Sequence, residues 1–365
     1  MSREAVEAAD QQLCDVRGVE CVPALLLPTL EVSTYIMINM SVSRVCSAGQ
    51  SAVVRKAIKS LPDGVGETIA LTVVEMGGEF GFQPTEISCL AVQPSQLPKV
   101  ATHVVLAAAN ATAVRTARFI HSAASGSSVG DAVAALANAT TQVHTTTMRR
   151  PLAGLVECEV YLRRAADAAA MRSALSAIAI GAAVAPVLTI VLLKDGLFAR
   201  SELVSLHCTS TIDPAGKRAV FAPSASALRS SGSARSEDRG GAVAVAVVSD
   251  GLVFLAGVDG TRPDALDALS RVGAAFEASK TQLNETLLCR FFQADPLNIE
   301  ALASGFFDVF NNATENFLHG VVAPPTRVEF VAKSGTCGSG SAAAVDGGGS
   351  ACEVLVKCIA ALPAN

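Results

Sequence analysis

Apolar residues in the last third of the chain recur first at strand spacing and then at helix spacing. Two apolar runs are separated by Ser249-Asp250-Gly251, which is typical of a β-hairpin turn. Apolar positions three and four residues apart follow in two longer stretches, and each stretch predicts a helix. The predicted elements are strands at 242–248, 251–257, 286–292, 327–332 and 352–361 and helices at 264–278 and 296–310. Their order is β-β-α-β-α-β-β.

The same order of elements is predicted before residue 214. It comprises strands at 104–109, 118–122, 155–162, 187–193 and 202–208 and helices at 131–143 and 165–180. The sequence DAVAAL, which starts at Asp131, matches DALDAL, which starts at Asp264, and VECEVYL aligns with LLCRFF. Repetition of a whole set of elements indicates two copies of one α+β unit in tandem.

Residue composition divides the chain around these two units. Residues 214–241 are rich in Ser, Gly, Ala and Arg without a sustained apolar period, so they predict a flexible linker. Residues 334–350 have a similar composition between two apolar runs, which indicates a long loop within the second unit. We therefore expect one unit at 101–213, a second at 242–365, and a partial accessory region of unclear fold at 1–100.

One stretch, residues 174–193, is uncharged over about the length of a bilayer span. It is rich in Ala, contains Pro186 and turns β-branched at 187–193, so we favour a helix end and a buried strand over a membrane span. The first residues contain no apolar segment typical of a secretory signal. The ten cysteines show no C-x-x-C spacing, and we expect buried, reduced thiols in a cytoplasmic protein.

Composition excludes several classes of function. Half of the residues are hydrophobic, which excludes a wholly disordered chain. The net charge of −5, the absence of Trp and the presence of only two Tyr argue against a nucleic-acid-binding protein. The five histidines are scattered without metal-ligand spacing, so we expect no metal and no cofactor.

The second unit resembles the YjgF/RidA family, also described as endoribonuclease L-PSP-like. The resemblance lies in GLVFLAG at 251–257, LLCRFF, FFDVF, PPTRVEF at 324–330 and VLVKCIAAL at 354–362. It implies an α+β, chorismate-mutase-like domain in which two helices cover one face of a sheet. Family members usually form trimers with ligand clefts between subunits. The first unit resembles a more diverged member, mainly through the internal repeat and LVECEVYL.

Many members of this family are 2-imino acid deaminases, and the resemblance implies roles for specific residues. Arg327, in a P-x-R context, would clamp the substrate carboxylate, a bidentate match that guanidinium makes well. Gly257 would let the substrate approach the backbone. A glutamate on the last strand positions water in the family, and this position is either Glu353 or Leu355, depending on the register. Glu329 would share a strand face with Arg327 and could instead neutralise it.

The first unit departs from the family pattern in the opposite way. Its arginine position falls at Leu188, so the clamp would be lost, while Glu202 could be its last-strand glutamate. A slip of one residue would turn the side chain at this position to the other face. The tyrosine that the family carries near its first strand is absent from the second unit.

A second resemblance is to diphthine–ammonia ligases, whose C-terminal part contains paired domains of this family. The sequence EMGGEF at 75–80 is similar to a stretch near the end of their ATP-pyrophosphatase domain, but the chain contains no Ser-Gly-Gly-x-Asp-Ser phosphate loop.

We expect a non-catalytic or weakly active protein that binds a small carboxylate metabolite or a protein partner. The alternatives are a deaminase that uses Glu353 or Glu202, and a protein related to diphthine–ammonia ligase that lacks the ATP-binding loop. The expected assembly is a homo-oligomer, a trimer in this family, or a pseudo-dimer within one chain.

Overall fold

The computed structural model describes thirteen stretches of the chain, and those before residue 111, together with 326–330, are described by their backbone. The stretches are 36–43, 70–74, 86–92, 103–106, 111–116, 118–143, 151–179, 182–193, 203–221, 244–293, 298–310, 326–330 and 354–363. They form a mixed α+β structure with two large sheets and one small sheet.

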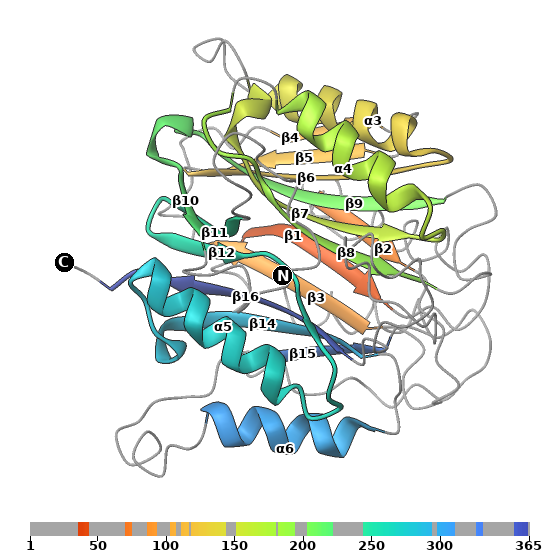
Figure 1. The fold of residues 1–365 in the computed structure, drawn as a ribbon. Helices are drawn as coiled ribbons and strands as arrows, with labels where there is room; N and C mark the ends of the chain where they lie inside the picture. Colours follow the sequence, from red (N-terminus) through yellow and green to blue (C-terminus); the bar gives the residue numbers. More distant parts are fainter. Residues whose placement is uncertain are drawn as a thin grey trace.

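The first large sheet has the strand order β4-β5-β6-β9-β7-β8, and helices α3 and α4 cover its outer face (Figure 1). Its elements are β4 His103–Leu106, β5 Ala111–Arg115, β6 Phe119–Gly126, α3 Val129–Val143, β7 Leu155–Leu162, α4 Asp167–Ile178, β8 Val187–Leu192 and β9 Val204–Thr211. Ser128 stabilises the start of α3, because its hydroxyl accepts from the Asp131 N–H at 3.1 Å and donates to the Asp131 carboxylate at 2.7 Å.

The second large sheet has the order β10-β11-β12-β16-β14-β15, and helices α5 and α6 cover its outer face. Its elements are β10 Arg218–Phe221, β11 Ala244–Ser249, β12 Leu252–Leu255, β13 Val258–Gly260, α5 Leu266–Ser279, β14 Thr286–Gln293, α6 Ile299–Phe310, β15 Thr326–Phe330 and β16 Val354–Ala361. The apolar stripe of α5, including Leu269, Val272 and Phe276, packs on this sheet to form one core. The matching core of the first sheet lies under α3 and α4.

The small sheet has the order β2-β1-β3 and consists of β1 Ile36–Ser43, β2 Ala70–Val74 and β3 Glu86–Val92. β1 pairs parallel with β2 and antiparallel with β3. β7 pairs in the same way with β8 and β9, and β14 with β15 and β16. Part of residues 1–100 therefore repeats a three-strand pattern of the large sheets, which the sequence pattern had left without a fold.

The register of the strands strengthens this correspondence. Each antiparallel pair has an irregularity at the matching place, between Met37 and Asn39, between Leu155 and Glu157, and between Thr286 and Leu288. In each strand, the second residue of the irregularity is followed directly by a residue whose register partner is a cysteine. These pairs are Met40 with Cys89, Cys158 with Cys208, and Cys289 with Cys358. A β-bulge bends and twists its strand, so the three strand sets share this bend.

The inner faces of the sheets pack on one another. β11 contacts β7 and β8, and β12 contacts β7, while β2 contacts β5, β6 and β9, and β1 contacts β5 (Figure 1). The same relation thus occurs twice along the chain. Strands of a hairpin in one sheet pack on the parallel strand pair of the preceding sheet.

The predicted linker is wrong at its N-terminal end. Pro214–Gly216 form a short 3-10 helix, and β10 then pairs antiparallel with β11. The buried Lys217 ammonium donates to the carbonyls of Ala153 at 2.8 Å and Leu155 at 2.6 Å, so this segment is attached to the first sheet. Burial lowers the pKa of Lys217 to about 8. The rest of the predicted linker, 222–241, lies outside the described residues.

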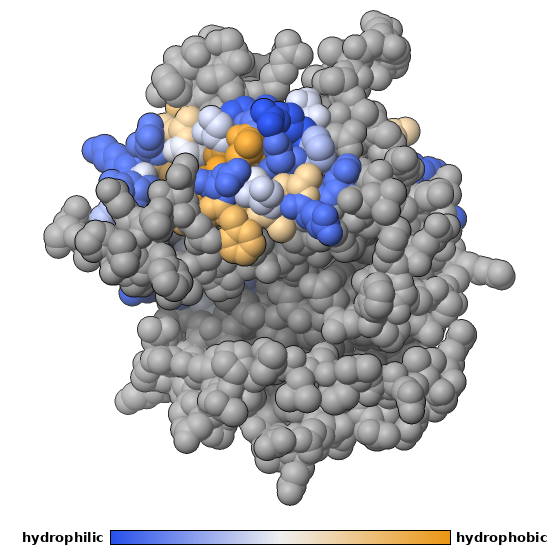
Figure 2. Space-filling model, turned by 90° about the horizontal axis from the view of Figure 1, so that it is seen from below, coloured by the Kyte–Doolittle hydropathy of each residue, from blue (hydrophilic) through white to orange (hydrophobic). Residues whose placement is uncertain are grey.

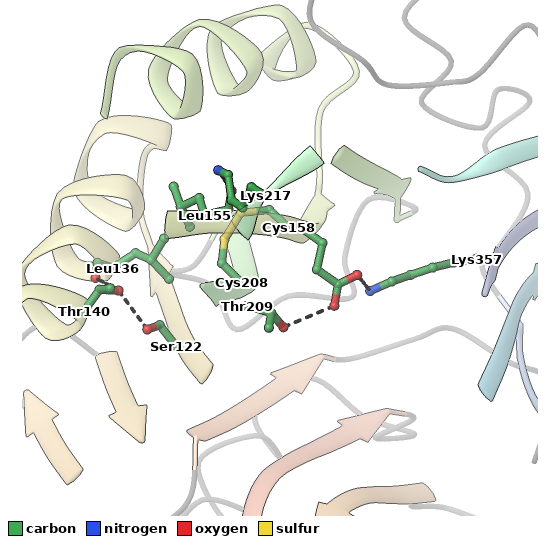
Figure 3. Close-up of a disulfide and its surroundings, with 10 residues drawn as sticks. Ser122, Leu136, Thr140, Leu155, Cys158, Cys208, Thr209, Lys217 and Lys357 are labelled. Atoms are coloured by element: carbon green, nitrogen blue, oxygen red, sulfur yellow. Dashed lines mark hydrogen bonds and ion pairs between the residues drawn. A yellow bond between two sulfur atoms is a disulfide. The ribbon is translucent and has the colours of Figure 1, made fainter. Parts of the chain in front are cut away.

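Four cysteines correct the expectation of reduced thiols. Cys158 and Cys208 form a disulfide between β7 and β9, with Cα atoms 4.1 Å apart (Figure 3). Cys289 and Cys358 form the matching disulfide between β14 and β16, with Cα atoms 4.2 Å apart. The reason is the register, which places the two cysteines of each pair directly opposite one another. All four are buried, as their apolar surroundings predict.

The uncharged stretch at 174–193 contains the end of α4 at Ile178 and the whole of β8. In the part of the chain that the structure describes, no helix is long and apolar enough to cross a membrane. On the face seen from below, where α6 is the lowest helix of Figure 1, hydrophobic residues are interspersed with hydrophilic ones (Figure 2). Phe307 of α6, at 53% exposure, is the most exposed large hydrophobic residue among those described.

Candidate functional site

A cluster of charged side chains is buried between the inner faces of the two large sheets. We call Glu157, Glu159, Tyr161, Arg290 and Lys357 the inter-sheet cluster. Alternation along β7 places the first three on the inner face, while Cys158, Val160 and Leu162 point into the core beneath the helices. Arg290 of β14 and Lys357 of β16 are register partners, so they lie side by side on the opposite sheet.

Arg290 and Glu159 form the centre of the cluster. The Arg290 Nη1 lies 2.5 Å from Glu159 Oε1 and 2.6 Å from Oε2, and the Nη2 lies 3.0 Å from the Tyr161 hydroxyl. Tyr161 in turn donates to Glu159 Oε1 at 2.5 Å. The guanidinium also lies over the Phe292 ring, 5.3 Å from its centroid. The contacts of Arg290 with Glu159 and Tyr161 connect residues more than a hundred positions apart in the sequence.

Lys357 completes the cluster with two carboxylates from β7. Its Nζ lies 2.8 Å from Glu157 Oε2 and 3.2 Å from Glu159 Oε2. Thr209 of β9 donates to Glu157 Oε1 at 3.2 Å. Figure 3 shows Lys357 extending from the second sheet toward the strands that carry the Cys158–Cys208 disulfide. Two carboxylates and two cations therefore balance within one buried cluster.

This balance keeps the central groups ionised. Burial would raise the pKa of Glu159, but the charges of Arg290 and Lys357 and the Tyr161 hydrogen bond together hold it far below its usual range. Burial would likewise lower the pKa of Lys357, yet Glu157 and Glu159 outweigh burial and raise it. Near neutral pH, Glu159 therefore has no proton to donate, and it is too weak a base to accept one.

Two histidines extend the polar surface of the first sheet. His121 of β6 and His207 of β9 stack with ring centroids 6.2 Å apart and planes inclined by 3°. Burial lowers the pKa of His121 to about 4, and burial together with neighbouring positive charge lowers that of His207 to about 3. Both rings are neutral at pH 7. The His121 Nδ1 atom is buried without a hydrogen-bond partner.

Gly257 follows β12 and lies against the first sheet. Its N–H donates to the Leu188 carbonyl at 3.3 Å. A Cβ atom at this position would lie 3.0 Å from Thr189 Cγ2 and 3.0 Å from Leu355 Cδ1. The glycine does allow a close approach, but in this structure the approaching groups are protein side chains.

Arg327 and Glu329 lie on β15, the edge strand of the second sheet. Arg327 is the register partner of Arg290, and Glu329 is the register partner of Phe292. Directly paired positions share a sheet face, so both occupy positions of the inner face. The structure thus places Arg327 in a row with Arg290 and Lys357. Gly257 lies farther from this edge of the sheet, because it follows β12, and β16 and β14 lie between β12 and β15.

The register corrects the position that corresponds to Arg327 in the first unit. Thr189 pairs with Glu159 as Arg327 pairs with Arg290, whereas Leu188 pairs with Cys158. The expected position, Leu188, is therefore wrong by one residue. The clamp is still absent from this sheet, because threonine carries no charge.

The two candidate glutamates, Glu353 and Glu202, lie outside the described residues. Leu355 is buried on the inner face with Tyr161 and Phe292. Counted from the paired cysteines, Glu353 aligns with Leu203 and Glu202 with Cys352, so the two glutamates do not occupy matching positions.

Sequence reasoning missed the whole inter-sheet cluster. The signal was the pair of acidic residues in VECEV and the single basic residues in LLCRFF and VLVKCI, each inside an otherwise apolar strand. A charge in a buried strand needs a partner, but the sequence alone does not tell which strand supplies it. Among the described residues, no group of His, Cys, Asp and Glu side chains could hold a metal ion.

Comparison with known proteins gives the fold and leaves the function open. No protein-family profile and no curated protein matches the chain. A solved chorismatase is similar over 92% of this chain and 95% of its own, with a TM-score of 0.52 and 13% identity. At this level of identity the similarity shows the fold alone.

Solved proteins of the YjgF family are also among the structural neighbours. They include a YjgF/YER057c/UK114 family member from Mycobacterium tuberculosis and the yeast protein YEO7. Each is 18% identical, covers 40% of this chain and 98% or 99% of its own, and has a TM-score of 0.27. The chain thus has a mixed α+β fold similar to that of a chorismatase, and any function has to be argued from its own side chains.

Proposed function

We propose that the chain is a RidA-like protein of fused, diverged units that binds a small carboxylate metabolite at Arg327 and does not hydrolyse imines. The proposal concerns the edge of the second sheet, where β15 lies beside β14. The shared strand pairing of the two large sheets and the small sheet supports the fusion of related units.

The observation that carries the proposal is the strand register, which aligns Arg327 with Arg290 and Lys357 in a row of basic residues across the second sheet. Arg290 and Lys357 in this row already have carboxylate partners, Glu159 and Glu157. Arg327 adds a third cation at the edge of the row. A guanidinium binds a carboxylate through two parallel, charge-assisted hydrogen bonds, which favours a carboxylate as the ligand at this edge.

The groups around the cluster support a protein that does not hydrolyse imines. An imine hydrolase needs a group that orients or deprotonates water. On the described part of the last strand, the inner face offers Leu355 and Lys357, and neither accepts a proton at neutral pH. Glu159 is held ionised by its cations, and the lowered pKa values of His121 and His207 make both weak bases.

Binding is tested with pyruvate, a 2-oxo acid of the kind that imine hydrolysis would release, by calorimetry on the full chain. Arg327→Ala should weaken pyruvate binding at least tenfold, about the 1.4 kcal/mol expected at the low end for a charge-assisted pair. Arg218→Ala, which removes an exposed arginine on β10, is the matched control and should bind as the wild type does. Equal affinity of the Arg327→Ala and wild-type proteins would overturn the clamp.

Glu329 provides a second test of the same site, because it occupies the next inner-face position along β15. If Glu329 partly neutralises Arg327, Glu329→Gln should tighten pyruvate binding. Weaker binding in this variant would mean that the carboxylate itself contributes to the site, and the clamp would then need a different ligand class.

Catalysis is tested by generating a 2-imino acid with an amino-acid oxidase and following its loss. We expect no acceleration by the protein. Acceleration that disappears in Arg327→Ala and in either Glu353→Gln or Glu202→Gln would make the protein a deaminase and would replace the non-catalytic proposal.

We also propose that one chain supplies the sheet contacts that would otherwise need separate subunits. The support is that β11 packs on β7 and β8, and β12 packs on β7, within the chain. Light scattering should give the mass of one chain, 37.3 kDa. A mass of three chains would favour the trimer typical of the family.

A further inference from the structure

The side chain of Glu159 is bound by the second sheet in the way that a separate carboxylate ligand would be. Its two oxygens accept hydrogen bonds from Nη1 of Arg290, and Oε2 also accepts one from Lys357 Nζ at 3.2 Å. The Tyr161 hydroxyl donates to Oε1. Both cations come from the opposite sheet, whereas β7 contributes the Tyr161 hydroxyl and the aliphatic part of the Glu159 side chain.

The neighbouring Glu157 shows that the two carboxylates have separate roles. Glu157 lies 2.8 Å from Lys357 and accepts from Thr209, so it satisfies Lys357 without Glu159. Glu159, in contrast, contacts Nη1 of Arg290 with both oxygens. Loss of Glu159 would therefore remove the ion pair that this carboxylate makes with Arg290, while Lys357 would keep its ion pair with Glu157.

The surroundings of this carboxylate exclude water. Glu159 is 1% exposed, and Arg290 is 8% exposed. Tyr161, Phe292, Leu355, Val191 and Leu193 form an apolar cluster alongside. A charge-assisted hydrogen bond is stronger in such surroundings than in water, so an anion of the right size would bind here with little competition from solvent.

We propose that Arg290, Lys357 and Tyr161 form a second carboxylate-binding site, which Glu159 occupies as a built-in ligand. The ligand class for the emptied site is a short aliphatic monocarboxylate, such as acetate. This site does not depend on the proposed function, because it uses Arg290 in place of Arg327.

The test is rescue of Glu159→Ala by sodium acetate in the full-length protein. Shortening the side chain removes the carboxylate and leaves space for a two-carbon acid. Acetate should raise the melting temperature of Glu159→Ala by several degrees in a saturable way, because a ligand that binds only the folded state stabilises it. Sodium chloride at equal ionic strength and acetamide, a neutral analogue of acetate, should not. The wild type should not respond to acetate beyond the chloride effect.

Two variants make the test specific for the Arg290 site. Glu157→Ala removes the other carboxylate of the cluster and should gain no saturable acetate response, since Arg290 keeps Glu159. Glu159→Ala combined with Arg290→Leu should also lose the response, while Glu159→Ala combined with Arg327→Ala should keep it. The last variant separates failure of this site from failure of the proposed Arg327 site.

If Glu159→Ala does not fold in buffer, refolding from urea with and without acetate gives the same information. Acetate, and neither chloride nor acetamide, should raise its refolded yield, and Glu159→Asp, which keeps a carboxylate, should need no acetate. The absence of any acetate effect on Glu159→Ala, or an equal effect on Glu157→Ala, would overturn the proposal.

Discussion

The sheets built around β7 and β14 have the same strand pairing and different charges at matched positions. Counted from the disulfides, Glu159 corresponds to Arg290 and His207 to Lys357. In an assembly of identical copies, matched positions carry the same residue in every copy. Two units in one chain can change independently, so that an acid on one sheet lies opposite a base on the other. The difference between the sheets therefore produces their complementarity.

The edges of the two sheets differ in the same manner. Thr189 in the first sheet corresponds to Arg327 in the second. Thr189 is buried and lies against Gly257, so this edge of the first sheet serves packing. We propose that the β15 edge of the second sheet binds the ligand. The following predictions separate the structural differences between the two sheets from the difference in ligand binding.

The largest effect is expected from the two disulfides, one in each sheet. They close loops of 50 and 69 residues, and loop-closure entropy gives each a contribution of about 4 kcal/mol to the free energy of unfolding. Cys158→Ala with Cys208→Ala, and Cys289→Ala with Cys358→Ala, should lower stability by similar amounts in urea titrations. Thiol counting on the unfolded, unreduced protein should find at most six of the ten cysteines reactive. Ten reactive thiols would contradict the pairing.

The next effect concerns the charges that differ between the sheets. Arg290→Met removes one of the two cations of the cluster from the buried Glu159 and should lower the free energy of unfolding by about 3–5 kcal/mol. Adding Glu159→Leu to the Arg290→Met variant removes the carboxylate that has lost its arginine partner. The double variant should recover part of the lost stability, because an apolar pair can replace a buried ion pair. A double variant no more stable than Arg290→Met would mean that the two side chains are not energetically coupled.

The histidines make the first sheet the acid-sensitive one. The pKa values of His121 and His207 lie below the ordinary value of about 6.5, so the unfolded chain takes up protons first as the pH falls. The contribution of the two neutral rings to the free energy of unfolding is therefore full above about pH 6.5. Below that pH it decreases by about 1.4 kcal/mol per pH unit for each ring, down to about pH 4 for His121 and about pH 3 for His207. The charged groups that influence His207 are Glu159, Arg290 and Lys357.

Urea titrations between pH 7 and pH 5 would measure this slope. Glu159 does not affect the slope between pH 7 and pH 5. Because its pKa is lowered in the folded state, its contribution to the free energy of unfolding decreases only below the usual carboxyl pKa of about 4.3. His121→Phe combined with His207→Leu should flatten the dependence. An unchanged slope in this variant would assign the acid sensitivity to other groups.

Most helices and strands could be predicted from the sequence, because each has one face toward a helix-covered core. The predicted strand at 155–162 and the end of the helix at 131–143 agree with the structure. The inter-sheet cluster could not be predicted in the same way. β7 is buried on both faces. Glu157 and Glu159 make one of these faces resemble an exposed, polar face in the sequence, so the pattern does not reveal that a second sheet packs on it. The cations that pair with them lie more than 130 residues away along the chain.

Two further misses have different physical causes. The expected arginine position at Leu188 was wrong by one residue, since a short match without a turn to fix it does not determine the register. The small sheet was missed because its strands are separated by long stretches and lack the preceding hairpin pattern that made the other two sets recognisable. Arg327 was found from its local sequence context, and its place beside Arg290 required the strand pairing.

The smallest effect distinguishes a packed sheet contact from a ligand cleft at Gly257. A Cβ atom there would lie 3.0 Å from Thr189 and Leu355, so Gly257→Ala should cost about 1–3 kcal/mol by overpacking. Thr189→Ser removes the crowding methyl group and should recover part of that loss. Gly273→Ala on α5 is the matched control, because its Cβ would lie 3.5 Å from Leu283, and alanine favours a helix. If Gly257→Ala were as stable as Gly273→Ala, the sheets could separate at Gly257 at little cost. The family's substrate approach at this glycine would then apply to this chain, and the Arg327 edge would no longer be the favoured site.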